Sequence, residues 1–482
     1  MRKFAKLLHI APSIVVAAAG TIILVWWLTY DPAQDLFVYL PGMDNQPAEL
    51  FTDDGGVNIG AHLQRFLGQP SELPGAWPRF RGADSDNISK EKNALAYEWG
   101  EDGPTVLWTV DLGEGHAAPA VRNGRVYVLD YDEKMRSDAL RAFSLETGAE
   151  IWRRWYQVAI KRNHGRSRTI PAVSDSHALT IGPRCHVMAV DAASGDFVWG
   201  IDLVEQYGTK VPLWWGGQCP LIDGEVAVIA PGGTALLLGV ELATGRVIWE
   251  TPNEHSWNMS HSSVMPMVFG GKKMYVYAAI GGVAGVSAEG EDVGRILWQT
   301  SEWRNSVVAP SPVVFADGRV FVTAGYGGGS AMLQVFEQRG GYDVRLLYAH
   351  DPKGGLASEQ QTPILYDGHL FGILPKDAGP RRNQFVCSDA DGNIVWASGK
   401  TNQFGLGPFI LADSKFFILS DVGVLTVINA STENYQELSE TKVLEGTDSW
   451  GPIAIAGGLM LLRDSRTMIC IDIRATEAQA GT

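Results

Sequence analysis

Six side chains that can hydrogen-bond, carry charge or transfer a proton stand at or just before short apolar runs that recur along the chain. Three of these runs are TIPAV (169–173), QCPLI (218–222) and QTPIL (361–365), each containing a proline. Imidazole titrates near neutrality, so two histidines brought together would suit proton transfer, and the whole set would suit a ligand site. Each histidine taken alone is better read as a hydrogen-bonded structural residue. The six residues are His116, Arg168, Gln218, His261, Glu359 and Gln361.

Two basic segments stand out in a chain with a formal net charge of −15 at pH 7. They are RRWYQVAIKRNHGRSR (153–168) and LPKDAGPRRNQF (374–385). Guanidinium groups bind carboxylates and phosphates through paired hydrogen bonds, so an anionic ligand or an acidic partner segment is expected there. The alternative is a pair of solvated loops whose cations are neutralised by local acids. The candidate residues are Arg162, His164, Arg166, Lys376, Arg381 and Arg382.

The elements that must position these residues are marked by a tryptophan that recurs at intervals of about 50 residues, or twice that. Five of the tryptophans follow a glycine by four residues, as in ASGDFVW (193–199) and ATGRVIW (243–249). Each interval holds short β-rich runs separated by Gly, Asn or Asp turns, which predicts four strands per repeat, the size of a propeller blade. The recurrent tryptophans are Trp108, Trp152, Trp199, Trp249, Trp298 and Trp396.

The repeat count predicts an all-β, eight-bladed β-propeller, with seven blades as the alternative. Tyr348 stands where a sixth repeat tryptophan is expected, and Val443 or Leu444 where an eighth is. The last run, MICIDI (468–473), has no fourth strand after it. We therefore expect TVLWTV (105–110) to complete the last blade and remove the exposed sheet edge.

The ring explains both recurring features. The tryptophans are expected to pack between neighbouring sheets, with the indole N–H reaching a turn carbonyl. The first strands of the blades would line a central channel, so the six polar residues would meet at one channel mouth. The alternative is that any water-filled mouth is polar, with its side chains satisfied by strand ends.

The pattern in AVDAASGDFVW (189–199) resembles the pyrroloquinoline-quinone (PQQ) repeat, and WPRFRGADSDNIS (77–89) resembles the first segment of bacterial PQQ-like propellers. The resemblance covers residues 77–474. It implies the propeller fold but not one activity. The superfamily includes quinoprotein alcohol and glucose dehydrogenases, and also the non-enzymatic propeller of the outer-membrane β-barrel assembly machinery.

The chain departs from the dehydrogenases of that superfamily. The methanol and ethanol enzymes carry a disulfide between adjacent cysteines against the quinone, whereas the cysteines here, Cys185, Cys219, Cys387 and Cys470, are never adjacent. Their Ca²⁺ ligands cannot be placed on this sequence residue by residue, and no CxxCH haem motif occurs. We expect four buried thiols and no metal site.

The N-terminal region predicts a membrane anchor. Residues 10–30 are uncharged and long enough to cross a bilayer as a helix, after a basic segment (1–9). That charge bias predicts a cytoplasmic N-terminus and a propeller in the bacterial periplasm. A cleaved signal peptide ending near AAAG (17–20) is the alternative. Residues 31–76 form an acidic spacer in which 36–40 and 59–67 favour short elements, and residues 475–482 form a tail.

These observations favour a propeller at the inner membrane that binds or scaffolds proteins of a cell-envelope complex. The alternative is a PQQ- and Ca²⁺-dependent dehydrogenase that oxidises an alcohol or sugar and passes electrons to membrane quinone. Nucleic acid is an improbable partner, because its phosphates need a basic face and the sequence pI is near 5.1.

Overall fold

The computed structural model describes residues 17–25 and 56–476. Residues 17–25 are helical and belong to a unit of their own, separate from the unit that holds the remaining described residues. Within the described ranges, no helix is both long and apolar enough to cross a membrane. The rest of the expected 10–30 span and the element expected at 36–40 lie outside the described residues.

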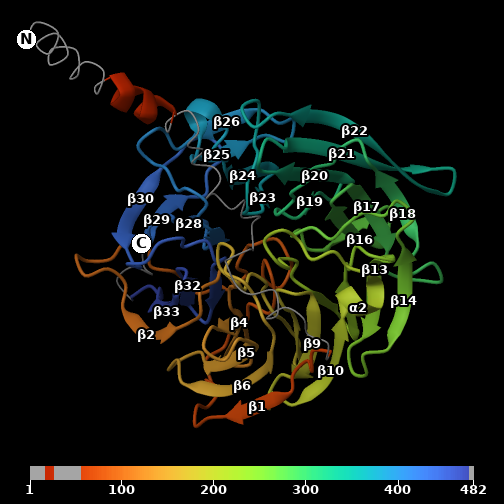
Figure 1. The fold of residues 1–482 in the computed structure, drawn as a ribbon, viewed down its shortest axis with the longest axis horizontal. Coiled ribbons are helices and arrows are strands. Elements are labelled where there is room, and N and C mark those ends of the chain that lie inside the picture. Colours follow the sequence, from red (N-terminus) through yellow and green to blue (C-terminus); the bar gives the residue numbers. More distant parts are fainter. Residues whose placement is uncertain (1–16, 26–55, 477–482) are drawn as a thin grey trace, which may run out of the picture. The chain divides into compact units, whose positions relative to one another are not determined.

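Residues 106–472 fold into eight sheets that follow one another around a ring in sequence order (Figure 1). The eight-bladed prediction is confirmed. Blades 1 and 2 contain β3 (Ala120–Arg122), β4 (Arg125–Asp132), β5 (Ser137–Ser144), β6 (Glu150–Gln157), β7 (Ala172–Val173), β8 (His177–Ile181), β9 (His186–Asp191) and β10 (Phe197–Asp202). Blades 3 and 4 contain β11 (Leu221–Asp223), β12 (Val226–Ile229), β13 (Ala235–Glu241), β14 (Val247–Pro252), β15 (Met265–Phe269), β16 (Lys272–Ala279), β17 (Gly282–Ser287) and β18 (Ile296–Thr300).

The second half of the ring repeats the same plan. Blades 5 and 6 contain β19 (Val313–Val314), β20 (Arg319–Ala324), β21 (Gly329–Gln338), β22 (Gly341–His350), β23 (Ile364–Tyr366), β24 (His369–Ile373), β25 (Phe385–Ser388) and β26 (Ile394–Ala397). Blades 7 and 8 contain β27 (Phe409–Ala412), β28 (Lys415–Leu419), β29 (Val424–Asn429), β30 (Glu437–Lys442), β31 (Ala454–Ala456), β32 (Leu459–Arg463), β33 (Thr467–Asp472) and β2 (Val106–Asp111). Two short helices lie in connections, α2 (Leu203–Tyr207) and η2 (Gly379–Arg381).

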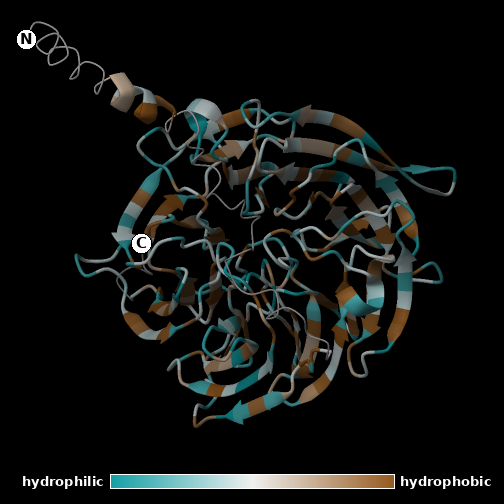
Figure 2. Ribbon diagram, in the orientation of Figure 1, coloured by the Kyte–Doolittle hydropathy of each residue, from teal (hydrophilic) through white to brown (hydrophobic). Residues whose placement is uncertain are grey.

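The ring closes through β2, which pairs antiparallel with β33 and places Trp108 opposite Cys470. The expected closure by the N-terminal run is therefore confirmed. A further strand, β1 (His62–Arg65), adds to the outer edge of blade 1 by pairing with β6. The outer strand β22 alternates between exposed and partly buried residues along its whole length, and the outer strands show mixed hydropathy in Figure 2.

Every blade has a register shift beside the tryptophan position. In blade 6, Trp396 pairs with Cys387 and the shift follows between Cys387 and Ser388. In blade 5, Tyr348 takes this position, as expected. In blade 7 the expectation of Val443 or Leu444 is wrong, because Ser439 pairs with Val427 beside the shift. Counting by a fixed interval misplaced the residue because the connection between the second and third strands is shorter in blade 7, from Leu419 to Val424, than in blade 6, from Ile373 to Phe385.

The repeat tryptophans pack against the next blade, as the sequence predicts. The indole N–H groups of Trp108, Trp199 and Trp396 donate to carbonyls of the next blade at 2.9, 2.7 and 3.1 Å, as expected. The expectation fails for two others, because Trp298 donates to Met274 Sδ of its own blade at 3.2 Å and the N–H of Trp152 is buried without a partner among the described residues. Gly148, in the turn of blade 1 with φ +67°, lies so close to Trp108 that a Cβ would come within 2.7 Å of the ring. Gly195, Gly245 and Gly294 lie in the same way against Trp152, Trp199 and Trp249, so these glycines make room for the tryptophan of the preceding blade.

A chain of side-chain hydrogen bonds joins blades 2 to 6 where their first strands begin. The N–H of Ile170 donates to Cys219 Sγ at 3.2 Å, and each following bond repeats this relation one blade further. Because the acceptors are side chains, the blades are tied together without continuous sheet pairing. The other three bonds run from Cys219 N to Ser263 Oγ, from Ser263 N to Ser311 Oγ and from Ser311 N to Thr362 Oγ1, at 3.0, 2.9 and 2.9 Å.

The segment of residues 77–91 crosses the channel from one side of the ring to the other. Arg81 is buried and donates to the carbonyls of Thr362 and Pro363, at the start of blade 6. A segment that bonds blades 1 to 3 and then blades 6 to 8 must pass across the ring. Its contacts with those blades are Trp77–Val121, Pro78–Val173, Arg79–Ile222, Arg81–Thr362, Asn87–Phe409 and Glu91–Gly457.

Candidate functional site

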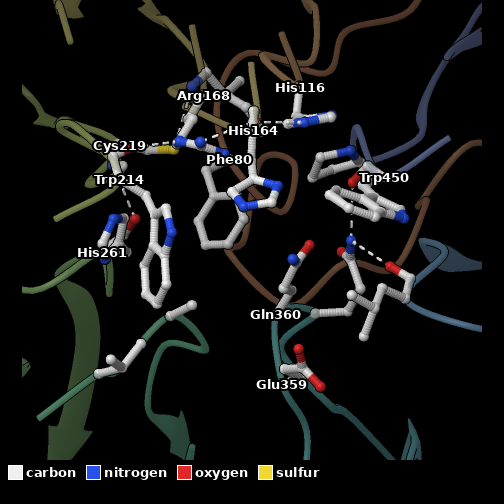
Figure 3. A pocket seen from close by; sticks show the side chains of 18 of the residues that line it. Phe80, His116, His164, Arg168, Trp214, Cys219, His261, Glu359, Gln360 and Trp450 are labelled. Atoms are coloured by element: carbon white, nitrogen blue, oxygen red, sulfur yellow. Dashed lines mark hydrogen bonds between the residues drawn. The ribbon is translucent and has the colours of Figure 1, made fainter. Parts of the chain in front are cut away.

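A cavity of about 410 Å³ occupies the channel mouth, and Phe80 of the crossing segment is part of its lining. Its walls come mainly from the connections that lead from one blade into the first strand of the next. Two hairpins add Tyr326, between β20 and β21, and Lys376, between β24 and β25. Figure 3 shows Trp214 and Trp450 on opposite sides of this cavity, with Phe80 between them.

The structure brings five of the six residues predicted for the channel mouth into this one cavity. They come from blades that are far apart in sequence, which is the convergence expected of equivalent positions in a ring. The sixth, Gln218, does not line it. The five residues are His116, Arg168, His261, Glu359 and Gln361.

Gln218 corrects the sequence prediction. Its side chain is fully buried and turns toward its own blade, where Nε2 donates to the carbonyl of Ala230 at 3.0 Å and Oε1 accepts from Ala230 N–H at 2.9 Å. Its neighbours Gly217 and Cys219 line the cavity instead. In extended backbone, successive side chains point to opposite sides, so a shift of one residue moves a side chain from the channel to the sheet.

Arg168 is held by three backbone carbonyls. Its Nε donates to Trp214 at 2.5 Å, and its Nη2 donates to Asn163 and His164 at 2.6 and 2.8 Å. Burial lowers the pKa of its guanidinium to about 10. Within the described part of the chain, no carboxylate lies within ion-pair distance of it, and its Nη1 makes no hydrogen bond. Arg168 is thus a fixed cation whose remaining donor is available at the cavity wall.

Two buried arginines, unlike the partly buried Arg168, show how a purely structural guanidinium is bonded in this fold. Arg81 uses all three nitrogens on four carbonyls, and so does Arg463. Neither lines the cavity. Arg168 differs from both in leaving Nη1 unused.

The two predicted histidines are uncharged at neutral pH. Burial, followed by the charge of Arg168, lowers the pKa of His116 to about 3 and that of His261 to about 4. Nε2 of His116 lies 3.0 Å from the carbonyl of His164, so the nitrogen that donates there carries the proton. Arg168 and Lys376 therefore supply the fixed positive charge of the cavity wall.

The aromatic walls are positioned by contacts of their own. Trp214 stacks on Tyr326 with ring centroids 5.3 Å apart and planes 20° apart. On the other side, the indole of Trp450 donates to Asp421 Oδ1 at 2.8 Å and lies 4.8 Å from the ring of His116. Such fixed flat surfaces suit a planar or apolar group held between them.

The remaining polar lining lies on blade 6. Glu359 is buried, and one of its oxygens lies 3.5 Å from Nζ of the exposed Lys376. Gln361 donates from Nε2 to the carbonyl of Trp450 at 2.9 Å, which ties blade 6 to blade 8 across the mouth.

The two basic segments divide between several environments. His164 and Lys376 line the cavity. Arg162 pairs with Glu114 at 2.8 Å, and Arg166 pairs with Glu133 at 3.0 Å. These two arginines match the alternative of cations neutralised by local acids.

Blade 6 carries the rest of the second basic segment. Arg381 donates to the carbonyl of Lys353 at 3.0 Å. Arg382 lines a second cavity, which shares Lys376 with the first and also holds Lys353 and Lys400. The basic residues of blade 6 are therefore continuous with the channel mouth.

Sequence reasoning missed the aromatic lining. Trp214, Trp450 and Phe80 do not belong to the repeat tryptophan position, and the spacing of the repeats gives no weight to them. Two of them could have been predicted from their positions before the first strand of a blade. Trp450 lies just before Pro452 at the start of blade 8, and Trp214 lies just before the run that opens blade 3. Phe80 had no such signal, since only the folded chain brings residues 77–91 across the channel.

Comparisons with known proteins agree with the fold. A family model described as "Outer membrane protein assembly factor BamB" matches residues 136–389. A europium-containing methanol dehydrogenase is 12% identical, with a TM-score of 0.56, over 83% of this chain and 90% of its own. A quinohemoprotein alcohol dehydrogenase from Comamonas testosteroni is 11% identical, with a TM-score of 0.57, over 83% and 81%.

BamB from Moraxella catarrhalis is 12% identical, with a TM-score of 0.49, over 76% of this chain and 99% of its own. No curated protein matches the sequence. At these identities the two dehydrogenase structures, with TM-scores above 0.5, are evidence for the propeller fold alone.

Proposed function

The chain belongs to the PQQ-like propeller family whose model is described as outer membrane protein assembly factor BamB, and from this premise we propose that it is a binding module for a protein of a cell-envelope complex. The observation that carries the proposal is the channel-mouth cavity. The crossing segment contributes to its lining, Trp214 and Trp450 are fixed on its two sides, and Arg168 leaves one donor unused there. Preorganised walls of this kind lower the entropic cost of binding.

The alternative, a quinoprotein dehydrogenase, needs oxygen ligands for Ca²⁺ that the residues of the cavity do not supply. The resemblance to those enzymes implies PQQ held with Ca²⁺, and Ca²⁺ prefers six to eight oxygen ligands. Glu359 is the one carboxylate in the lining, and it faces Lys376. Elsewhere among the described residues, no group of three or more His, Cys, Asp or Glu side chains is arranged to hold a metal ion. The residues do not fit calcium-bound PQQ, and we derive no oxidation step.

We also propose that residues 10–30 anchor the chain in the inner membrane, with the propeller in the periplasm. The uncharged stretch and the basic residues before it support this orientation. Protease treatment of intact spheroplasts should degrade the propeller and spare the N-terminus. Protection of the propeller in intact spheroplasts would exclude this arrangement.

The binding role is tested by photo-crosslinking in cells with a benzophenone amino acid. Tyr326 is 59% exposed beside the cavity, and Val268, 62% exposed at the far end of β15, provides the matched control position. A discrete adduct with an envelope protein is expected from position 326 and not from position 268. Adducts from position 268 only, or none from either, would contradict the proposal.

The enzymatic alternative has a direct test on the purified full chain. Incubation with PQQ and Ca²⁺ should leave the visible absorbance equal to the sum of the separate components, and no artificial dye should be reduced with alcohols or sugars. Stoichiometric uptake of the quinone with dye reduction would replace the binding role with the dehydrogenase.

A further inference from the structure

We infer that the partner contributes an acidic segment that binds across the channel mouth, with one carboxylate at Arg168 and the following acidic residues on blade 6. The inference rests on the proposed function, since it names the chemistry of the partner. It is carried by two independent observations, the unused donor of Arg168 and a cluster of unpaired cations beside the same cavity.

The first observation is electrostatic. A partly buried cation without a carboxylate partner, as Arg168 is, carries a cost unless its donors are satisfied, and the buried Arg81 and Arg463 satisfy theirs with carbonyls. Arg168 keeps Nη1 at the cavity wall, beside two histidines that are neutral at pH 7. A carboxylate entering between Trp214 and Trp450 would supply the charge-assisted hydrogen bond that the fold leaves open.

The second observation is the basic cavity on blade 6, lined by Lys353, Lys376, Arg382 and Lys400. In the described part of the protein, Lys353, Arg382 and Lys400 form no ion pair. The acidic residue of this lining, Asp377, accepts a hydrogen bond from Gly327 N–H at 2.8 Å. In a chain with a net charge of −15, such a surface selects an anionic partner by charge complementarity.

The two cavities form one path, because Lys376 lines both. Lys376 also faces Glu359 at 3.5 Å, so an incoming carboxylate would compete with Glu359 for it. An extended peptide fits this path better than a compact anion, since the path joins a narrow aromatic site to a broad basic surface. The occupant is therefore an acidic protein segment with an apolar or aromatic residue near one carboxylate.

The test measures binding of fluorescent synthetic peptides to the full chain by anisotropy. One peptide is rich in Glu and carries a Phe, and the comparison peptide has Gln in place of every Glu. The Glu peptide should bind and the Gln peptide should not. Binding of the Glu peptide should weaken as salt rises, because the pairs on blade 6 are exposed.

A triple variant on blade 6, K353Q/R382Q/K400Q, should lower affinity for the Glu peptide about tenfold, the sum expected of three exposed pairs. The matched control K134Q/K210Q/R339Q removes three exposed cations outside both cavities and changes the net charge equally. It should bind as the unmodified chain does. Equal weakening by both variants would overturn the inference, because only net charge would then matter.

Arg168 is tested separately with R168K, which keeps the charge and removes the planar fork. Affinity for the Glu peptide should fall while the thermal unfolding midpoint stays within a few degrees. Unchanged affinity would overturn the role assigned to Arg168. Inorganic polyphosphate that binds as tightly as the Glu peptide would overturn the acidic segment in favour of a phosphate polymer.

The two proposals fail in distinguishable ways. If the Glu peptide does not bind but position 326 still crosslinks an envelope protein, the acidic segment is wrong and the binding role stands. If the peptide binds and no crosslink forms, the mouth binds acidic ligands and the envelope partner is wrong.

Discussion

His116 and Arg168 share one hydrogen-bond acceptor, the backbone carbonyl of His164, at 3.0 and 2.8 Å. The shared carbonyl fixes a guanidinium beside a buried imidazole, and both side chains line the cavity. Burial, and next the charge of Arg168, lower the pKa of His116 and keep its imidazole uncharged, although the hydrogen bond to the His164 carbonyl acts in the opposite direction. Because the charge state of His116 differs between the folded and unfolded chain, the stability of the folded chain depends on pH through this residue.

Acid should destabilise the folded chain through His116. Its pKa is about 3 when folded against 6.5 as the ordinary value, so the unfolded chain takes up a proton first as pH falls below 6.5. The contribution is fully present above that pH and is lost toward pH 3, with a slope of about 1.4 kcal/mol per pH unit. Urea unfolding of H116N between pH 6.5 and 4 should show a slope smaller by about that amount. Parallel curves for the two proteins would contradict this.

Asp138 should have the opposite pH dependence. Burial raises the pKa of its carboxyl to about 7, while Tyr156 donates to its Oδ2 at 2.8 Å. The folded chain therefore holds a proton that the unfolded chain has lost, and stability declines from pH 3.8 up to about 7. D138N should unfold at higher urea concentration than the unmodified chain at pH 8, and the advantage should shrink by pH 5. An advantage that is equal at both values would exclude the raised pKa.

Gly148→Ala should destabilise the ring through contact with Trp108. The added Cβ would lie 2.7 Å from the indole, and φ is +67°. Gly368 is the matched control, with φ +71° and nothing within 4 Å. We expect G368A to cost about 1 kcal/mol from backbone strain and G148A about 2 kcal/mol more from overpacking. Equal losses in urea unfolding would show that the packing against Trp108 is unimportant.

Ser311→Ala should cost about 1–2 kcal/mol, because it leaves the buried N–H of Ser263 without its acceptor. Ser330 provides the control, since its hydroxyl is buried without a partner among the described residues. S330A should be close to neutral in the same denaturation measurement. A neutral S311A would mean that the bond from Ser263 N to Ser311 Oγ, between blades 4 and 5, contributes nothing to stability.

Much of the fold was predictable because the same four-strand unit recurs. The period placed Trp108 in the last blade and Tyr348 at the sixth tryptophan position, and both are confirmed. The period failed at Ser439, because the connection between the second and third strands is shorter in blade 7 than in blade 6. Five of the six residues expected at the channel mouth line the cavity, whereas Gln218 does not. Successive side chains of an extended chain point to opposite sides, so an error of one residue directs a side chain away from the channel.

The sequence by itself determined the architecture, the closing strand and the presence of polar and basic residues at one end of the ring. Those properties follow from local patterns that repeat, and each blade must satisfy them independently. Only the tertiary structure decided which side chains act together. Arg162 is neutralised by Glu114, whereas Arg168, a few residues later, keeps a donor for the cavity. Phe80 lines the same cavity from a segment outside the repeats. Which cations meet a carboxylate, and which side chains share a cavity, depends on distances between residues that are remote in sequence.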